Sequence, residues 1–468
     1  MSGPAISALT LAAAISQPLS LSAQTLTAPQ KFAHDVYQEL VEINTVPATG
    51  DTGKAADAMA ARFRAAGFPE SDIHVFKPAP RKGNLVVRLH GSGARRPILL
   101  LAHLDVVEAL RYDWSFDPFK LTEQDGYYYG RGTGDDKFMA SAFVSNLIRF
   151  KQEGFKPDRD IIVALETDEE IGDRDGVGIQ WLIKNHKDLI DAEFGLNEGG
   201  AGVGLRNGKA LRNSVQTSEK VFADFTLEVK NPGGHSSAPR KDNAIYRLAA
   251  ALTRLGQFDF PIKLNETTHS WLQLAAPFED KQIGADMRSM ASDHPDPAAV
   301  ERLSALPPYN AQLRTTCVAT LLQGGHADNA LPQSAQANIN CRVLPGESLE
   351  EVQRTLARVV ADDQVAVVPA LLDVQSPPSP LRPDVISAIK QVSDALWPGA
   401  PVIPIMSAGA SDSRFLRNVG IPVYGTSGLA NNIDESRAHG KDERVPVKSF
   451  YDGQEYLYRL VKILTAPK

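Results

Sequence analysis

The stretch Leu99-Leu100-Leu101-Ala102-His103-Leu104-Asp105 is an apolar run that ends in a histidine and an aspartate. Two later clusters also lie against hydrophobic runs: Gly130-Arg131-Gly132-Thr133-Gly134-Asp135-Asp136-Lys137 and Ala164-Leu165-Glu166-Thr167-Asp168-Glu169-Glu170. Burying imidazole and carboxylate groups is costly unless something compensates. The usual compensation is a bound metal or a network of mutual hydrogen bonds. The three clusters therefore indicate a metal site of the hydrolytic kind.

Helices and strands alternate around these clusters. Apolar residues recur at helical spacing in 32–43, 55–66 and 138–150, and short apolar runs predict strands at 84–89, 97–102 and 161–165. Two more helices are predicted at 385–396 and 450–464. This alternation is typical of an α/β layer with a mainly parallel sheet.

The pattern changes in the middle of the chain. Residues 221–229 and 335–343 alternate apolar and polar side chains, and helices are predicted at 243–255 and 349–360. This order suits a two-layer α+β unit with one open sheet face. The interval 262–314 has no clear periodicity and is expected to be an irregular insertion, and 375–380 resembles a linker. We therefore predict a discontinuous first domain, 24–214 and 373–468, into which a second domain, 215–372, is inserted.

Composition limits the class of protein. The chain has 468 residues, of which 43% are hydrophobic and 22% charged, which allows a large core and more than one domain. A net charge of -7 argues against a nucleic-acid partner held by phosphate contacts. No segment reaches the apolar length of a transmembrane helix.

The N-terminus and the cysteines bear on the compartment. Residues 1–23 carry no charged side chain, and Leu21-Ser22-Ala23 before Gln24 resembles a cleavage site. We predict a signal peptide at 1–23 and a secreted or periplasmic protein, although a basic n-region is missing. The alternative is a disordered N-terminal tail. Cys317 and Cys341 exclude a disulfide scaffold and a thiolate zinc cluster, while one disulfide and two buried thiols both remain open.

The chemistry of the clusters suggests roles for individual residues. Asp105 lies two residues after His103, so its carboxylate is expected to accept the second ring N–H and fix the tautomer. Asp135 follows a glycine-rich loop, where a carboxylate can bridge two cations; phosphate binding is the weaker alternative, because two carboxylates would face the phosphate. Glu169 and Glu170 are expected to have different roles: one binds metal, and the other takes a proton from water. A solvated acidic turn is the alternative for that pair.

In order along the chain, the motifs resemble those of the dizinc aminoacylase and glutamate-carboxypeptidase family. Asn197-Glu198-Gly199 and Ala438-His439-Gly440 supply the last two. The long-lid branch, with N-fatty-acyl-amino-acid hydrolases and carboxypeptidase S, looks nearest. The resemblance implies a zinc-peptidase-like mixed sheet flanked by helices, with an inserted α+β lid and dimerisation domain.

The resemblance also implies the metal centre. It assigns two zinc ions to five ligands: His103 and Glu198 on one ion, Glu170 and His439 on the other, and Asp135 bridging both. Glu169 would be the general base and later the general acid, Asp105 would lie behind the ligands, and the Asp135–Asp136 peptide would be cis. Cobalt or manganese could replace zinc.

Four further residues match substrate positions of the family. His235 in Gly233-Gly234-His235-Ser236 resembles the lid histidine that reaches a neighbouring subunit's site and polarises the scissile carbonyl, so a homodimer is implied. Asn329, Arg342 and Ser411 match substrate-binding positions, and Arg342 suits a carboxylate. Taken alone, His235 could be an incidental surface residue and Arg342 part of an interdomain salt bridge.

Two departures from the family pattern stand out. Phe138 follows Lys137 where glycine is common, and Gly409-Ala410-Ser411-Asp412 replaces Gly-Gly-Thr-Asp. The ligand set survives both changes.

We predict a zinc hydrolase that cleaves a peptide or an N-acyl amino acid at the amide bond next to a free carboxylate. The insertion 262–314 is expected to shape substrate choice. A dizinc aminopeptidase or dipeptidase is one alternative, and a non-catalytic binding protein on the same scaffold is another.

Overall fold

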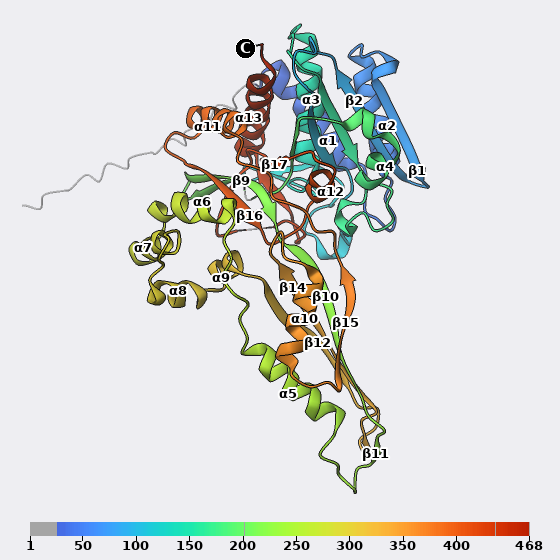
Figure 1. Ribbon diagram of the computed structural model, residues 1–468. Helices are drawn as coiled ribbons and strands as arrows, with labels where there is room; N and C mark the ends of the chain where they lie inside the picture. The colour runs from blue at the N-terminus through green and yellow to red at the C-terminus, as the bar shows by residue number, and fades with distance from the viewer. Residues whose placement is uncertain (1–25, 201, 436, 468) are drawn as a thin grey trace, which may run out of the picture.

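The structure is a computed structural model that describes residues 26–467 except Ala201 and Ser436. The predicted signal peptide, 1–23, lies outside the described residues. Figure 1 shows a large sheet flanked by helices, from which a second, smaller sheet extends.

The large sheet has ten strands and is mixed, as the fold class predicted. The strands are, in sheet order, β1 (Ile73–Ala79), β2 (Lys82–Leu89), β6 (Ile161–Glu166), β3 (Ile98–His103), β7 (Phe194–Asn197), β17 (Val423–Gly425), β9 (Lys209–Glu219), β8 (Val203–Arg206) and β18 (Ala430–Asn432), with β16 (Val402–Ser407) paired to β9. The run β6-β3-β7-β17 is parallel, whereas β1 pairs with β2 and β2 with β6 in antiparallel fashion. A small sheet of β4 (Thr122–Gln124), β5 (Tyr127–Tyr129) and β19 (Arg444–Pro446) lies beside it.

Helices cover both faces of the large sheet. One face packs against α1 (Ala28–Glu42), α2 (Thr52–Ala65), α3 (Lys137–Gln152), α11 (Pro383–Leu396) and α13 (Val447–Thr465), and the other against α4 (Ile179–Ile190) and α12 (Ser413–Asn418). Along β3, Leu100 points to the first core while Leu99 and Leu101 point to the second. Burial on both sides explains why these strands are continuous apolar runs in the sequence.

The smaller sheet is antiparallel, in the order β12-β14-β10-β15. Its strands are β12 (Thr316–Gly324), β14 (Ser334–Val343), β10 (Val221–Lys230) and β15 (Val365–Leu372), and a two-stranded ribbon of β11 (Gly234–His235) and β13 (Ala330–Leu331) lies at its far end. Helices α5 (Ala244–Gly256) and α10 (Leu349–Val360) cover one face, and the other face is open, as predicted. A disulfide joins Cys317 to Cys341 across β12 and β14, which decides between the two states that the sequence left open.

The prediction that 262–314 is irregular is wrong. This stretch forms four short helices, α6 (Glu266–Ala275), α7 (Lys281–Met290), α8 (Pro297–Ser304) and α9 (Pro307–Leu313). Helices of seven to ten residues leave too few turns for a periodic pattern to be recognised. They bury a separate apolar cluster that includes Leu272, Met287 and Ile403, so the insertion packs on β16 of the large sheet.

Among the residues that the structure describes, no helix combines the length and the apolar character needed to cross a membrane.

Candidate metal centre

The strand ends bring the first candidate ligands together. His103 is the last residue of β3, Glu198 directly follows β7, and a single turn, Glu169–Ile171, comes shortly after β6. These three strands are parallel neighbours, so their carboxyl ends meet at one edge of the sheet. Polar groups that follow separate apolar runs in the sequence are therefore neighbours in space.

Asp135 lies between two histidines. Its Oδ1 is 3.1 Å from Nε2 of His103, and its Oδ2 is 3.2 Å from Nε2 of His439. The same nitrogen of His439 is 3.0 Å from Oε2 of Glu170. The Asp135–Asp136 peptide is cis, as the resemblance implied. One carboxylate thus faces a different imidazole with each oxygen, which is the arrangement that a bridging ligand needs.

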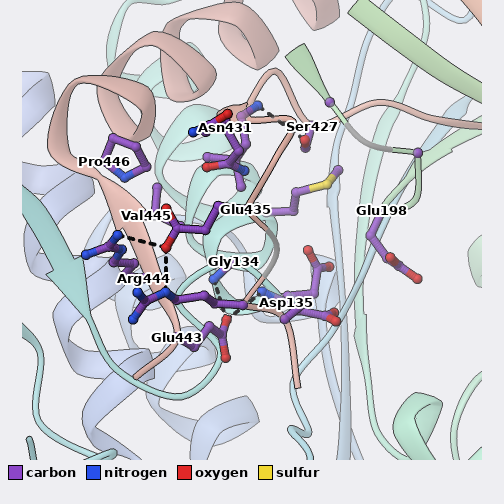
Figure 2. Close-up of a pocket in the computed structure, with 18 of the residues that line it drawn as sticks. Gly134, Asp135, Glu198, Ser427, Asn431, Glu435, Glu443, Arg444, Val445 and Pro446 are labelled. Carbon is purple, nitrogen blue, oxygen red and sulfur yellow. Dashed lines mark hydrogen bonds and ion pairs between the residues drawn. The ribbon is translucent and has the colours of Figure 1, made fainter. Parts of the chain in front are cut away.

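The donor atoms are close enough for metal ions. Two groups have all their ligand atoms within 4.8 Å of one another: His103, Asp135 and Glu170, and His103, Glu169 and Glu198. Figure 2 shows Asp135 and Glu198 among the residues that line one pocket. Oε1 of Glu170 is buried without a hydrogen-bond partner among the described residues. Imidazole nitrogens and carboxylate oxygens are the ligands that zinc takes, so the residues present fit a pair of such ions.

Asp105 acts differently from the prediction. The ring N–H at Nδ1 of His103 donates to the backbone carbonyl of Asp105 at 2.9 Å, while the Asp105 carboxylate lies 3.7 Å away. That carboxylate instead accepts the backbone N–H groups of Glu169 at 3.2 Å and Glu170 at 3.0 Å. The chain turns after His103, so the carbonyl comes nearer to the ring than the side chain does. The carbonyl directs Nε2 of His103 toward Asp135, and the carboxylate fixes the turn with the two glutamates.

Burial sets the protonation of the cluster. Burial raises the pKa of Glu169 and Glu198 well above the usual range, and neighbouring carboxylates add to the effect. Burial alone would lower the pKa of His103, but its hydrogen bond to Asp135 and nearby negative charges raise it well above its ordinary value. Hydrogen bonds to Asp135 and Glu170 raise the pKa of His439 to about 10. The concentration of acidic groups in this buried place favours the binding of cations.

Without metal, the protein is expected to lose stability as the pH rises. Burial raises the pKa of Asp105 to about 6 and that of Asp412 to about 7. A carboxyl group whose pKa is higher in the folded chain binds more protons there than in the unfolded chain, so the free energy of unfolding falls as pH rises through that window. The melting temperature of chelator-treated protein should therefore fall between pH 5 and pH 8. Zinc-loaded protein is the control and should show a smaller decline; equal melting curves with and without metal would contradict the expectation.

His235 and Asn329 lie away from this cluster in the chain's own fold. His235 belongs to β11, and the backbone carbonyl of Asn329 accepts a hydrogen bond from the next residue, Ser236, at 3.1 Å. Both side chains are exposed. Figure 1 shows β11 at the end of the small sheet that lies farthest from the large one. The structure thus brings His235 and Asn329 together, but not with the candidate ligands.

Arg342 and Ser411 lie near the junction of the two sheets. Nη1 of Arg342 donates to the carbonyl of Ala408 at 3.2 Å, and its guanidinium lies over the ring of Phe222 at 5.0 Å. No ion pair of Arg342 occurs within the described part of the chain. A cavity of about 430 Å³ is lined by Ala408, Ser411 and Glu198. The Ser411 hydroxyl is buried and donates to Glu219 at 2.9 Å, so it is already engaged inside the protein.

A second cavity, of about 350 Å³, is also lined by Glu198 (Figure 2). It is lined by Asp135, Glu198 and several polar side chains, namely Arg212, Asn431, Asn432, Glu435, Arg437 and Arg444. Glu435 is held by Arg437 at 2.6 Å and by Arg444 at 2.8 Å. Apolar side chains, among them Leu429, Ile433 and Val445, also line this cavity, so the surroundings of the candidate ligands are mixed in polarity on this side.

The predicted site residues did not include Arg131 and Glu443, which form a buried ion pair beside Asp135. The only sequence indication was that each stands four residues before or after a candidate ligand. The two residues pair because two loops that are distant in the sequence meet in the fold, and no local sequence pattern predicts that meeting.

Comparison with known proteins gives a consistent result. The pattern described as Peptidase family M20/M25/M40 matches residues 99–463. A "Probable carboxypeptidase S-like 2" of Dictyostelium discoideum is 31% identical over 380 residues, covering 78% of this chain and 71% of the relative. The human "N-fatty-acyl-amino acid synthase/hydrolase PM20D1" is 30% identical over 377 residues, covering 78% and 74%. The crystal structure of the M20 family metallo-carboxypeptidase Sso-CP2 from Sulfolobus solfataricus matches with a TM-score of 0.68 at 18% identity, covering 92% of this chain and 99% of that one. That likeness confirms the fold.

Proposed function

The chain belongs to peptidase family M20/M25/M40 and is a metal-dependent amide hydrolase, and we propose that its substrate carries a free carboxylate next to the scissile bond. The observation that carries metal-dependent hydrolysis is the sharing of Asp135 by His103 and His439, beside two buried glutamates, and the substrate carboxylate rests on Arg342. Such a site can hold two cations at one carboxylate.

We assign the ligands as the sequence predicted: His103 and Glu198 to one ion, Glu170 and His439 to the other, and Asp135 to both. These residues would hold zinc, which would supply a Lewis acid for the scissile carbonyl and lower the pKa of water to about 7. Cobalt or manganese would suit the same oxygen and nitrogen donors.

Glu169 is the proposed general base. Its backbone N–H donates to the Asp105 carboxylate, which holds the turn. The carboxylate of Glu169 is not needed to hold the turn and lies at the ligand cluster. Burial raises its pKa, which suits a group that takes a proton from water and then gives it to the leaving amine.

Arg342 is the proposed carboxylate receptor. Its guanidinium donates to one carbonyl and makes no ion pair among the described residues, so donors remain for a substrate. We expect Arg342→Met to lower kcat/KM by about 10- to 100-fold, the value of a hydrogen bond to a charged group. The measurement is kcat/KM for a dipeptide and for the same dipeptide with an amidated carboxyl group. The wild type should discriminate between the two and the variant should not; equal loss on both substrates would contradict the role.

A panel of dipeptides and N-acyl amino acids, with and without chelator, tests the function as a whole. The cavity near Asn431 is lined by polar and apolar side chains, so it suits a peptide as well as the long acyl group that relatives named as N-fatty-acyl-amino acid hydrolases suggest as the second candidate. An aminopeptidase would need a free acidic group for the substrate amine, and Glu435 is already paired. Activity that survives complete removal of metal would exclude the proposed chemistry, and no activity on any substrate of the panel would favour the non-catalytic alternative.

We further propose that 215–372 is a lid through which two chains form a homodimer, with 24–214 and 373–468 as the catalytic part. β12 is an edge strand of nine residues with exposed Val318, Leu321 and Leu322, and such an edge is normally covered. Pairing of two lids would carry His235 and Asn329 toward the site of the second copy.

Mixing inactive variants tests this arrangement. His235→Ala and Glu169→Gln are each expected to be inactive alone, because each lacks one part of every site. A mixed dimer contains one site with both native residues, so activity should return after the two proteins are mixed and allowed to exchange. No recovery in a mixture shown to contain hybrid dimers would exclude a shared site.

The disulfide between Cys317 and Cys341 supports an extracytoplasmic location, because disulfides persist in oxidising compartments. Together with the uncharged residues 1–23, it leads us to propose secretion or a periplasmic location, which cell fractionation would test.

A further inference from the structure

Two candidate ligands lie on loops from opposite parts of the chain. Asp135 ends the glycine-rich loop 130–135, and His439 lies in the loop 437–443. A buried ion pair joins the two loops: Nη1 of Arg131 is 2.8 Å from Oε2 of Glu443, and the side chains are 3% and 2% exposed. We call Arg131 and Glu443 the loop pair.

Glu443 holds the backbone that leads to Asp135. Its Oε2 accepts the N–H of Gly132 at 2.9 Å, and its Oε1 accepts the N–H groups of Gly134 at 2.7 Å and Asp135 at 3.2 Å (Figure 2). The backbone N–H of Gly130 in turn donates to the carbonyl of Glu443 at 3.1 Å. The position of Asp135 is therefore fixed directly by this carboxylate.

Arg131 holds the other loop. Its Nη2 donates to the carbonyl of Gly440 at 3.0 Å, one residue after His439, and its guanidinium lies over the ring of Trp114 at 5.0 Å. His439 has a φ of 60°, a left-handed conformation that costs free energy for a residue with a side chain. The hydrogen bond to Gly440 therefore stabilises the backbone next to the residue that must keep this left-handed conformation.

The two candidate metal positions depend on this pair to different degrees. His103 and Glu198 lie at the ends of adjacent, hydrogen-bonded strands of the large sheet. His439 has no strand or helix to hold it and reaches Asp135 only through its loop. Loss of a contact between the loops should therefore displace His439 from Asp135 while His103 keeps its place.

We infer that Arg131 and Glu443 are positioning residues that set the separation of Asp135 and His439, and thereby control whether the metal position at Glu170 and His439 is occupied. The inference rests on the proposed function, because it presumes a two-metal centre. It gives the loop pair a role that a merely structural ion pair would not have, namely different effects on the two metal positions.

The test compares metal retention in three variants with the wild type. Glu443→Gln keeps the shape of the side chain but loses the charge and places an amide against backbone N–H groups. Arg131→Lys keeps the charge but loses the planar fork that reaches Glu443 and Gly440 together. Asp158→Asn is the matched control: Asp158 is buried, accepts from Arg95 at 2.6 Å, and lies before β6, at the end opposite the ligands.

Each full-length protein is loaded with zinc, dialysed against graded chelator, and analysed for metal content and melting temperature. The wild type should hold two ions per chain. Arg131→Lys should retain one ion as tightly as the wild type and hold the second about 10- to 100-fold more weakly, as is typical for loss of a group that orients a ligand. Glu443→Gln also loosens the backbone at Asp135, so it should weaken both ions, the second more than the first. Asp158→Asn should hold two ions even where its melting temperature falls. Substitution with Co²⁺ should show the same loss as a halved visible absorption.

Three results would overturn the inference: two ions held with wild-type affinity by both variants, equal weakening of both ions, or the same loss in Asp158→Asn. If Glu443→Gln does not fold, Arg131→Lys decides, because it leaves no buried negative charge unpaired. A wild-type protein that binds no metal would instead overturn the proposed function, so the two failures are distinguishable.

Discussion

Replacing Glu169 by glutamine is expected to lower kcat by about 10²- to 10⁴-fold, the usual contribution of a general acid or base. Glutamine has nearly the same shape but cannot accept the proton of the attacking water or deliver it to the leaving amine. The Asp105 carboxylate accepts the backbone N–H of Glu169 and does not contact the Glu169 side chain, so the turn should persist in the variant. The measurements are kcat and KM on the best substrate of the panel, together with metal content, which should remain at two ions.

Asp168→Asn is the matched control for Glu169. Asp168 is the preceding residue, is buried, and pairs with Lys82. Its φ of 72° is one that asparagine also adopts readily. This variant should melt at a lower temperature and keep a kcat close to that of the wild type. If both variants lost activity to the same extent, the effect would belong to the turn, and Glu169 would not be the base.

Removal of the Asp135 carboxylate should have the larger effect. Asp135→Ala is expected to abolish measurable activity and to reduce the metal content from two ions to one or none, because one carboxylate serves both His103 and His439. Zinc should also raise the melting temperature less than it does for the wild type, since that stabilisation exists only for ions that the folded state binds. Metal analysis, activity and melting with and without zinc give the three measurements.

Glu435→Gln is the control for Asp135. Glu435 lines the same cavity but is occupied by Arg437 and Arg444, and it is not among the candidate ligands. This variant should keep two ions. An Asp135→Ala protein that also kept two ions and its activity would exclude Asp135 as a bridge.

Much of the site was predictable because strand ends are visible in a sequence. The apolar runs before His103 and Glu169 are β3 and β6, and their parallel pairing brings the polar residues together. The predicted helix 138–150 is confirmed as α3, which begins two residues after Asp135. For these elements, the local apolar pattern was enough to predict the strand or helix that the structure contains.

Other features depend on contacts between distant parts of the chain. Phe138 replaces the glycine common in the family, and its ring closely approaches Gly453 of α13 and packs against Phe450 at 5.8 Å. The ring of Phe138 has space because residue 453 of α13 is a glycine. This relation appears only once α3 and α13 pack against each other. The same limit applies to Asp105, whose carboxylate serves two backbone groups more than sixty residues away.

The strand β16 links the insertion to the cavity near Arg342, and we expect this link to influence substrate fit. The helices α6 to α9 pack on it through Ile403, and its residues Ile405 and Met406 line the cavity beside Arg342. None of these elements carries a candidate ligand. Substitutions in the insertion can therefore reshape the cavity while the donor atoms keep their positions. A scaffold arranged in this way allows the substrate to change while the reaction stays the same, and the relatives carry both carboxypeptidase and N-fatty-acyl-amino acid hydrolase names.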